Sequence, residues 1–435
     1  MRKLYIMLAT LFVLTACDND LEQFPPNIAS SESLTDYAGV LNAAYYYQHG
    51  SCTPMAVMGD FRADNAFMFE APYTDFDVFD ANLTTMEDQF FGPFYTALYK
   101  SILSANSVIE KSTDATEVGE AKFLRALSYF KLVRVFGDVT VNLSDQPSTT
   151  DRSILTRQSA ESVYNSVIIP DLEDAIAALG TEIVNGRASK YAAQGLLGKV
   201  YVQMGNFSSA ESHLAAVVNG AAAAGIELQA DFEDIFGFEN DLNSEIIFAT
   251  QISSSVVDEY GFSEFWSWSG GLDTKSLNPL DEDLVAAFDA SPGDLRRDVT
   301  IDTVSTVMAS PKFPQADGPD HDWIELRLAD VILLYAEALN ENGSTTEALA
   351  ELNKIRTRAG LADATATSQA DVRQAIQDER RLELAFEGQR WFDLVRTGMV
   401  DAEMGETIDA NYHIFPIPVS EILSSFDAIT QNAGY

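Results

Sequence analysis

The chain has 435 residues, a formal net charge of −39 and a hydrophobic content of 46%. This charge excludes nucleic acid as a ligand, because phosphate binding requires a basic surface, and it disfavours strongly anionic polymers. The hydrophobic content is ample for a core, and the length fits two or three domains or one large repeat domain. A strongly acidic surface also keeps a protein soluble at high salt, which is typical of a marine or saline habitat.

The N-terminal segment has the composition of a secretory signal. Arg2 and Lys3 precede an apolar stretch over residues 4–14, which is shorter than the roughly 20 residues that a membrane-spanning helix needs. Residues 14–17 resemble a bacterial lipobox, which implies that residues 1–16 are a signal peptide and that Cys17 is lipid-modified. The alternative is a plain secretory signal with a chance cysteine at the boundary.

Three segments near the N-terminal half are predicted to be helices. Apolar residues recur at three-to-four spacing over residues 90–111, 120–136 and 159–179. Gly137 ends the second helix, and Pro170 is expected to kink or interrupt the third, because proline lacks the backbone donor of a helix interior.

Two later segments, 189–218 and 328–356, each predict a pair of antiparallel helices. Both fit a tetratricopeptide-like frame of about 34 residues, with small residues where the paired helices approach and bulky ones between pairs. The matching positions are Gly198, Tyr201, Ala210 and Leu214 in the first segment, and Ala336, Leu339, Ala348 and Leu352 in the second. The alternative is two unrelated helical hairpins. We therefore expect a mainly α fold with degenerate helical repeats near 90–136, 159–218 and 324–396.

A long stretch without helical periodicity, near residues 225–323, separates the two repeats. We call it the insertion. It contains clusters of Gly, Pro, Ser and Asp, and residues 245–251 alternate as a short β-strand would. A loop-rich segment of this length is usually functional rather than a linker, so we expect the insertion to carry the ligand site.

Motifs along the whole chain resemble the SusD/RagB family, the surface glycan-binding lipoproteins of polysaccharide-utilisation systems. The matching segments are 59–65, 121–138, 327–338, 379–396, 415–418 and 431–435. The resemblance implies a single SusD-like domain over residues 17–435 at the outer-membrane surface, anchored by lipid at Cys17. It also implies a TonB-dependent outer-membrane transporter, of the SusC-like kind, as partner.

The charged residues of these motifs are interpreted as structural. Arg380, Glu383, Glu387 and Arg390 recur at three-to-four spacing, so they are predicted to pair along one helix face. Trp391 is expected to lie in the core. Arg125, Arg134 and Arg327 lie on apolar helices and are predicted to be partners in buried ion pairs.

The best candidate for a sugar platform is an aromatic cluster in the insertion. Its members are Tyr260, Phe265, Trp266 and Trp268. Sugars pack their C–H faces on aromatic rings while amides and carboxylates bind their hydroxyls. Trp266 and Trp268 would face the same way in an extended loop, about 6–7 Å apart. The alternative is a hydrophobic cluster under a loop.

A second candidate group precedes the helical region. Asp60, Arg62, Asp64 and Asn65 could hydrogen-bond sugar hydroxyls, or they could merely tie a loop down. Tyr73 belongs to the same group and is also a candidate ligand contact. The sequence does not decide between these two roles. The three tyrosines at 45–47 are interpreted as packing residues.

Signals for an enzyme are absent from the sequence. The four histidines show no metal-ligand spacing, His321 is expected to be solvated, and no nucleophile elbow occurs. Cys52 is expected to be a small buried residue. We therefore expect no catalytic residue, no metal and no cofactor.

The sequence thus favours a non-catalytic glycan-binding lipoprotein that delivers its ligand to a transporter. The segment around Trp266 carries Glu259, Glu264 and Asp273 but no basic residue before Lys275, so a neutral polysaccharide is expected, with a laminarin-type β-glucan as the specific hypothesis. Two alternatives stay open: a repeat scaffold that binds a peptide or protein, with structural aromatics, and, less favoured, an endo-acting glycosidase.

Overall fold

Helices make up most of the chain in the computed structural model, which describes residues 36–67, 71–148, 151–253, 280–301, 310–313 and 321–435. The α-helices are α2 (Ala38–Tyr46), α3 (Cys52–Ala56), α4 (Gly92–Lys111), α5 (Ala115–Phe136), α6 (Ala160–Val163), α7 (Ile169–Ala178), α8 (Lys190–Gln203), α9 (Phe207–Gly220), α10 (Glu282–Asp289), α11 (Arg297–Thr300), α12 (Leu328–Glu341), α13 (Thr345–Arg358), α14 (Gln369–Glu383), α15 (Arg390–Thr397), α16 (Val400–Glu403) and α17 (Val419–Ser424). Short 3-10 and π turns connect several of them.

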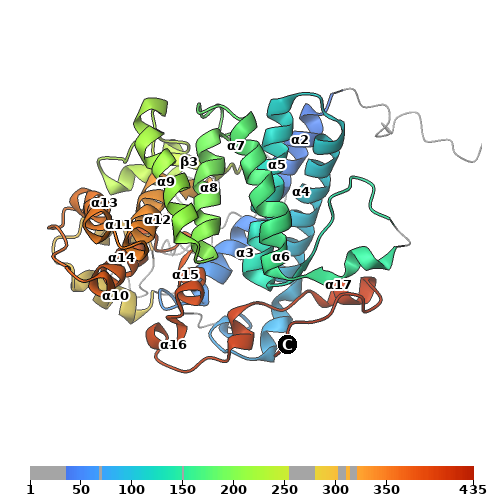
Figure 1. Ribbon diagram of the computed structural model, residues 1–435. Helices are drawn as coiled ribbons and strands as arrows, with labels where there is room; N and C mark the ends of the chain where they lie inside the picture. Colours follow the sequence, from blue (N-terminus) through green and yellow to red (C-terminus); the bar gives the residue numbers. More distant parts are fainter. Residues whose placement is uncertain (1–35, 68–70, 149–150, 254–279, 302–309, 314–320) are drawn as a thin grey trace, which may run out of the picture. The chain divides into compact units, whose positions relative to one another are not determined.

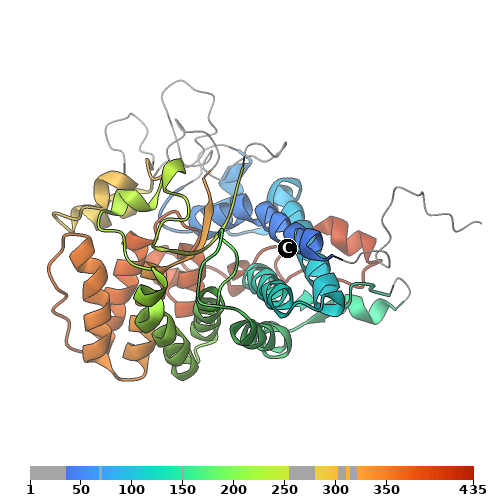
Figure 2. The same ribbon diagram turned by 90° about the horizontal axis from the view of Figure 1, so that it is seen from above.

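The long helices pack side by side in chain order. Helix α4 packs on α5, α5 on α7, α7 on α8, α8 on α9, α9 on α12, and α12 on both α13 and α14. Figures 1 and 2 show the same order, from the teal α4 and α5 to the orange α12 and α13. The predicted mainly α, repeat-type fold is confirmed.

Close helix contacts explain the small residues of the repeat frame. A Cβ on Gly198 of α8 would come within 2.5 Å of the Leu214 side chain of α9. Ala210, Ala336 and Ala348 are fully buried at the equivalent close approaches. Small residues at these positions therefore let the paired helices meet, as the spacing predicted.

Pro170 interrupts the third predicted helix as expected. Helix α6 passes into a π turn over Tyr164–Ile168 before α7 begins at Ile169. In this turn the backbone N–H of Ile169 bonds to the carbonyl of Tyr164, five residues back. The wider turn directly precedes Pro170, whose ring and missing N–H are incompatible with a regular α-helical ladder.

The described strands form two small antiparallel pairs. Strand β1 (Val139–Thr140) pairs with β2 (Arg157–Gln158), and β3 (Ile246–Thr250) pairs with β4 (Trp323–Arg327). The second pair joins Ile246 to Arg327 and Thr250 to Trp323. Strand β3 lies within residues 245–251, as predicted, but it is buried throughout rather than on alternate positions only. Because most of the insertion lies between β3 and β4 in the sequence, this pair closes its base.

The 379–396 segment differs from the prediction. Helix α14 ends at Glu383, and a turn leads to α15, so the four charged residues cannot share one helix face. Each pairs with other elements instead; Arg380, for example, binds Asp330 on α12. Trp391 is fully buried and donates its indole N–H to the His413 carbonyl, which confirms its core role.

For three other buried residues, one prediction is confirmed and two are wrong. Arg125 forms a bidentate pair with Asp171 at 2.7 and 2.8 Å, as predicted. Arg134 does not show the predicted ion pair among the described residues; its guanidinium lies 4.4 Å from the Phe130 ring centre and 4.7 Å from that of Phe392. His321 is buried rather than solvated.

Cys52 is buried, as predicted. Within the described part of the chain, every helix is too short or too polar to cross a membrane.

Candidate functional site

The aromatic part of the insertion is attached to the fold at two described points. At its start, the backbone N–H of Ile252 donates to the Asp322 carboxylate at 2.8 Å, just after β3 ends. At its end, Leu280 forms an antiparallel bridge with Ala66, and the N–H of Asp281 donates to the Asn65 carbonyl at 3.1 Å. Tyr260, Phe265, Trp266 and Trp268 lie between these points, outside the described residues.

Asp60 has a structural role. Its side chain is completely buried, and its two carboxylate oxygens accept hydrogen bonds from the backbone N–H groups of Gly388 at 2.6 Å and Phe386 at 3.2 Å. Burial raises the pKa of this carboxyl to about 7. Asp60 therefore ties its own segment to the turn between α14 and α15, and it is not available to a surface ligand.

Asp64 and Asn65 also have structural roles. The Asp64 carboxylate forms two 2.7 Å hydrogen bonds with Arg390, and the Asn65 side chain accepts one from Arg381 at 3.0 Å. Asp64 is 5% exposed and Asn65 is 0% exposed. Of the two roles that the sequence left open, these contacts support tying the loop down. Asp60, Asp64 and Asn65 are therefore structural residues and not candidate ligand contacts.

Aromatic side chains beside these polar residues do reach the surface. Phe67, which immediately follows the bridge between Ala66 and Leu280, is 40% exposed. Tyr73 is half-buried, its ring edge contacts Phe90, and its hydroxyl accepts a hydrogen bond from Gln89 at 2.7 Å. Tyr73 thus remains a candidate ligand contact, close in sequence to the point where the insertion returns to the fold.

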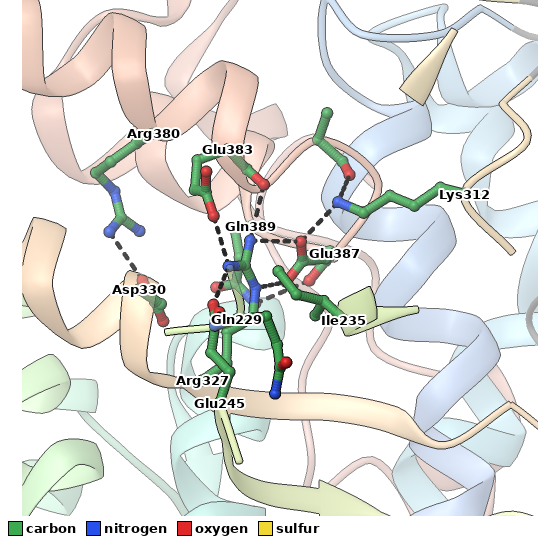
Figure 3. Close-up of polar contacts among 12 residues, drawn as sticks. Gln229, Ile235, Glu245, Lys312, Arg327, Asp330, Arg380, Glu383, Glu387 and Gln389 are labelled. Atoms are coloured by element: carbon green, nitrogen blue, oxygen red, sulfur yellow. Dashed lines mark hydrogen bonds and ion pairs between the residues drawn. The ribbon is translucent and has the colours of Figure 1, made fainter. Parts of the chain in front are cut away.

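A buried cluster of charges fixes the base of the insertion (Figure 3). Arg327, at the end of β4, binds Glu245 at 2.8 Å, Glu383 at 2.6 Å and Glu387 at 2.7 Å. Lys312 adds a 2.6 Å contact to Glu387. Since Glu245 and Lys312 belong to the insertion, the cluster joins it to α14 and the turn that follows.

A second arginine, Arg296 of the insertion, extends this cluster. Arg296 binds Asp294 at 2.7 Å, Glu379 at 2.7 Å and Glu383 at 3.0 Å. Burial acting without partners would raise the pKa of the Glu383 carboxyl, but Arg358, Arg327 and Arg296 together hold it well below its usual range. The cluster is therefore ionised and mutually compensated, which suits a rigid support rather than acid–base chemistry.

The described residues contain no group of three or more His, Cys, Asp or Glu side chains arranged to hold a metal ion. The described residues instead offer the rings of Phe67 and Tyr73 at the surface and a buried, ion-paired cluster around Arg327. Aromatic rings at a surface suit ligand binding.

Comparisons with known proteins agree with this geometry. Residues 16–202 match the family model described as starch-binding associating with outer membrane, and residues 304–413 match the model of the SusD family. A SusD superfamily protein from Parabacteroides distasonis has a solved structure that covers 94% of this chain and 100% of its own, with a TM-score of 0.79 and 22% identity. The chain belongs to the SusD/RagB family. SusD-like proteins bind carbohydrate and are non-catalytic.

Two further SusD-like relatives are informative. SusD-like protein P2 of Formosa agariphila is 26% identical over 510 residues, covering 98% of this chain and 98% of the relative. A solved structure described as a laminarin-binding SusD-like protein is 25% identical, with a TM-score of 0.73, and covers 92% of this chain and 99% of its own. The SusD-like fold therefore spans nearly the whole chain.

Sequence reasoning missed a group of residues near the end of β3. Asn185 and Gly186 form a tight turn facing Gln251, which directly follows the strand. The Asn-Gly pair is a strong turn signal, and it could have marked this site had it been combined with the predicted strand at 245–251.

Proposed function

We propose that this SusD-like protein captures a neutral polysaccharide at the cell surface, with Trp266 and Trp268 as the stacking platform. One observation carries the proposal: the bridge between Ala66 and Leu280 joins the residue that follows the tryptophan-bearing stretch, 254–279, to the segment that bears Phe67 and Tyr73. The two aromatic-bearing stretches of the chain therefore meet at a described contact. Phe67 and Tyr73 are proposed as further contacts for the polymer.

Charge favours a neutral ligand. Asp281, Glu282 and Asp283 follow the bridge directly, at the start of α10. A uronate or sulfate group near them would meet like charge, which costs free energy even where salt screens it. The likeness to a laminarin-binding structure supports a laminarin-type β-glucan as the specific ligand.

We further propose that lipid at Cys17 holds the protein on the outer membrane and that it hands its ligand to a TonB-dependent, SusC-like transporter. Purification of the tagged, full-length lipoprotein from native outer membranes tests this partnership. A TonB-dependent transporter recovered in the complex supports it, and its absence under conditions that preserve membrane complexes contradicts it.

The glycan site is tested by isothermal titration with laminarin, alginate and a sulfated galactan. We expect Trp266→Ala and Trp268→Ala each to cost about 1–3 kcal/mol of laminarin binding, by analogy with the loss of a stacked ring. Phe426→Ala is the matched control, because Phe426 is a 78% exposed aromatic residue in another part of the fold.

Two results would contradict the proposal. Normal laminarin binding by both folded tryptophan variants would exclude the platform. Preference of the wild type for alginate or the sulfated galactan would exclude the charge argument.

A further inference from the structure

A cavity of about 380 Å³ lies between α2, the turn at residues 184–187 and the end of β3. Its volume is at the low end of the range for small-molecule sites, about 300–1,000 Å³. It has room for a short oligosaccharide but not for a folded partner. The side chains that matter below are Asn42, Tyr45, Tyr46, Asn185, Arg187 and Gln251.

The wall formed by the turn is rigid. The N–H of Arg187 bonds to the Val184 carbonyl at 3.0 Å, and the two central residues, Asn185 and Gly186, have φ of 51° and 69°. An Asn-Gly pair adopts this conformation with little strain. A Cβ on Gly186 would come within 2.4 Å of the Gln251 amide nitrogen, so the glycine makes room for that amide.

Tyr45 fastens the turn to the helices. Its hydroxyl donates to the Glu120 carboxylate on α5 at 2.5 Å and accepts the N–H of Ala188 at 2.9 Å. Burial, and then the charge of Glu120, raise the pKa of this phenol well above its usual value, so it stays a neutral donor. The cavity is thus preformed, which lowers the entropy cost of binding.

Among the described lining residues, Arg187 is the one lysine or arginine, and its charge is already compensated. Arg187 binds Glu120 at 2.6 Å, donates to the Asn42 side chain at 2.8 Å, and lies 4.6 Å from the centre of the Tyr45 ring. Its charge therefore offers little net attraction to an anion, and its contact with Asn42 orients an exposed amide at the rim. This arrangement suits an uncharged ligand.

The remaining lining has the composition that carbohydrates require. Tyr46 is 42% exposed and offers an aromatic face, with the His49 ring centre 5.1 Å from its own. Asn42, Asn185 and Gln251 are exposed amides around it. A ring that packs a sugar C–H face, beside amides that both donate to and accept from hydroxyls, is typical of saccharide sites.

We propose that this cavity is a second carbohydrate subsite, which binds one or two neutral sugar units. The inference rests on the proposed function, because it assumes that the ligand is a neutral glycan. Gln251 contributes to the cavity and lies three positions before the insertion segment that carries the tryptophans.

The test compares four full-length proteins in detergent: wild type, Asn185→Ala with Gln251→Ala, Trp266→Ala with Trp268→Ala, and all four changes together. Binding of laminaribiose, cellobiose, maltose and laminarihexaose is measured by isothermal titration. We expect the two amide changes to weaken hexaose binding about tenfold, since each lost hydrogen bond contributes about 0.5–1.5 kcal/mol. Residual disaccharide binding should survive in the tryptophan pair and disappear when all four changes are combined.

Two further variants separate a direct contact from a disturbed fold. Tyr46→Ala should weaken binding while Tyr46→Phe preserves it, because only the ring face is required. Asn165→Ala is the matched amide control; Asn165 is exposed and bonds only to its own helical turn among the described residues. All variants should unfold at the temperature of the wild type.

The possible outcomes distinguish the two proposals. If the amide pair and Tyr46→Ala bind every saccharide as the wild type does, the second subsite is excluded, whatever the tryptophan variants do. If the tryptophan pair binds normally but the amide pair does not, the subsite stands and the main platform is misplaced. If the wild type binds none of the saccharides, both proposals fail.

Discussion

Gly59 and Gly388 touch backbone to backbone. A Cβ on Gly59 would come within 2.3 Å of the Gly388 carbonyl, and one on Gly388, whose φ is 69°, within 2.9 Å of the Met55 carbonyl oxygen and of the Trp323 ring. The neighbouring Asp60 carboxylate accepts the Gly388 N–H. Two motifs more than 300 positions apart in sequence therefore meet at a contact that only glycine permits.

The first prediction concerns this contact. Gly59→Ala should lower the free energy of unfolding by about 1–3 kcal/mol, because the added methyl group meets backbone that cannot rotate away. Gly39→Ala, in α2, is the control: nothing lies within 4 Å of its Cβ position, so it should be neutral or stabilising by about 0.5–1 kcal/mol. Urea unfolding of both proteins measures the difference, and equal stability would contradict the contact.

The second prediction follows from the raised pKa of Asp60. Aspartate in the unfolded chain binds its proton below its usual pKa of 3.8, whereas folded Asp60 retains it up to about pH 7. Between these values the folded state binds more protons, so the free energy of unfolding falls as pH rises. Relative to Asp60→Asn, the wild type should lose up to about 4 kcal/mol across this range, at about 1.4 kcal/mol per pKa unit.

Urea titrations of the two proteins at several pH values measure this difference. The replacement itself carries a pH-independent cost, since an amide cannot accept from all three donors, which are the N–H groups of Gly388 and Phe386 and the side-chain amide of Asn65. Only the slope with pH is therefore diagnostic. A constant difference between wild type and variant would show that Asp60 titrates normally.

The third prediction concerns the buried charge cluster. Arg327→Met should cost about 3–5 kcal/mol of stability, because Glu245, Glu383 and Glu387 would remain buried without their shared cation. Lys354→Met is the control: Lys354 is largely exposed and pairs with Glu351 within one helix, so its loss should cost less than about 1 kcal/mol. Similar unfolding curves for the two variants would show that the cluster is not a support.

The fourth prediction concerns the proposed anchor. Cys17→Ala should remove the acceptor of the lipid, so the protein should leave the membrane fraction or accumulate unprocessed. Membrane fractionation and metabolic labelling with a radioactive fatty acid measure the two effects. A membrane-bound, lipid-labelled Cys17→Ala protein would show that the anchor lies elsewhere.

Local patterns in the sequence predicted the helical part of the fold. The spacing of Gly198, Ala210, Ala336 and Ala348 identified the helix pairs, because close helix approach repeats at fixed intervals along the chain. The Arg125 pair with Asp171 was accessible to the same reasoning, since an arginine on an apolar helix needs a buried partner.

Contacts between distant segments were not predictable from such patterns. Nothing in the spacing of residues 59–65 indicated that their polar side chains meet residues 381–390. The charged run at 380–390 resembled one helix face, although a turn after Glu383 sends each residue to a different partner. Arg134 illustrates the same limit: Phe392, more than 250 positions away in sequence, forms part of its cation site.

The two described attachments on either side of residues 254–279 have a consequence for substitutions in that stretch. Ile252 and Leu280 are held through backbone groups, by the Asp322 carboxylate on one side and by the backbone of Ala66 on the other. Neither attachment depends on the identity of the side chains at residues 254–279. We therefore expect substitutions within residues 254–279 to leave both attachments in place.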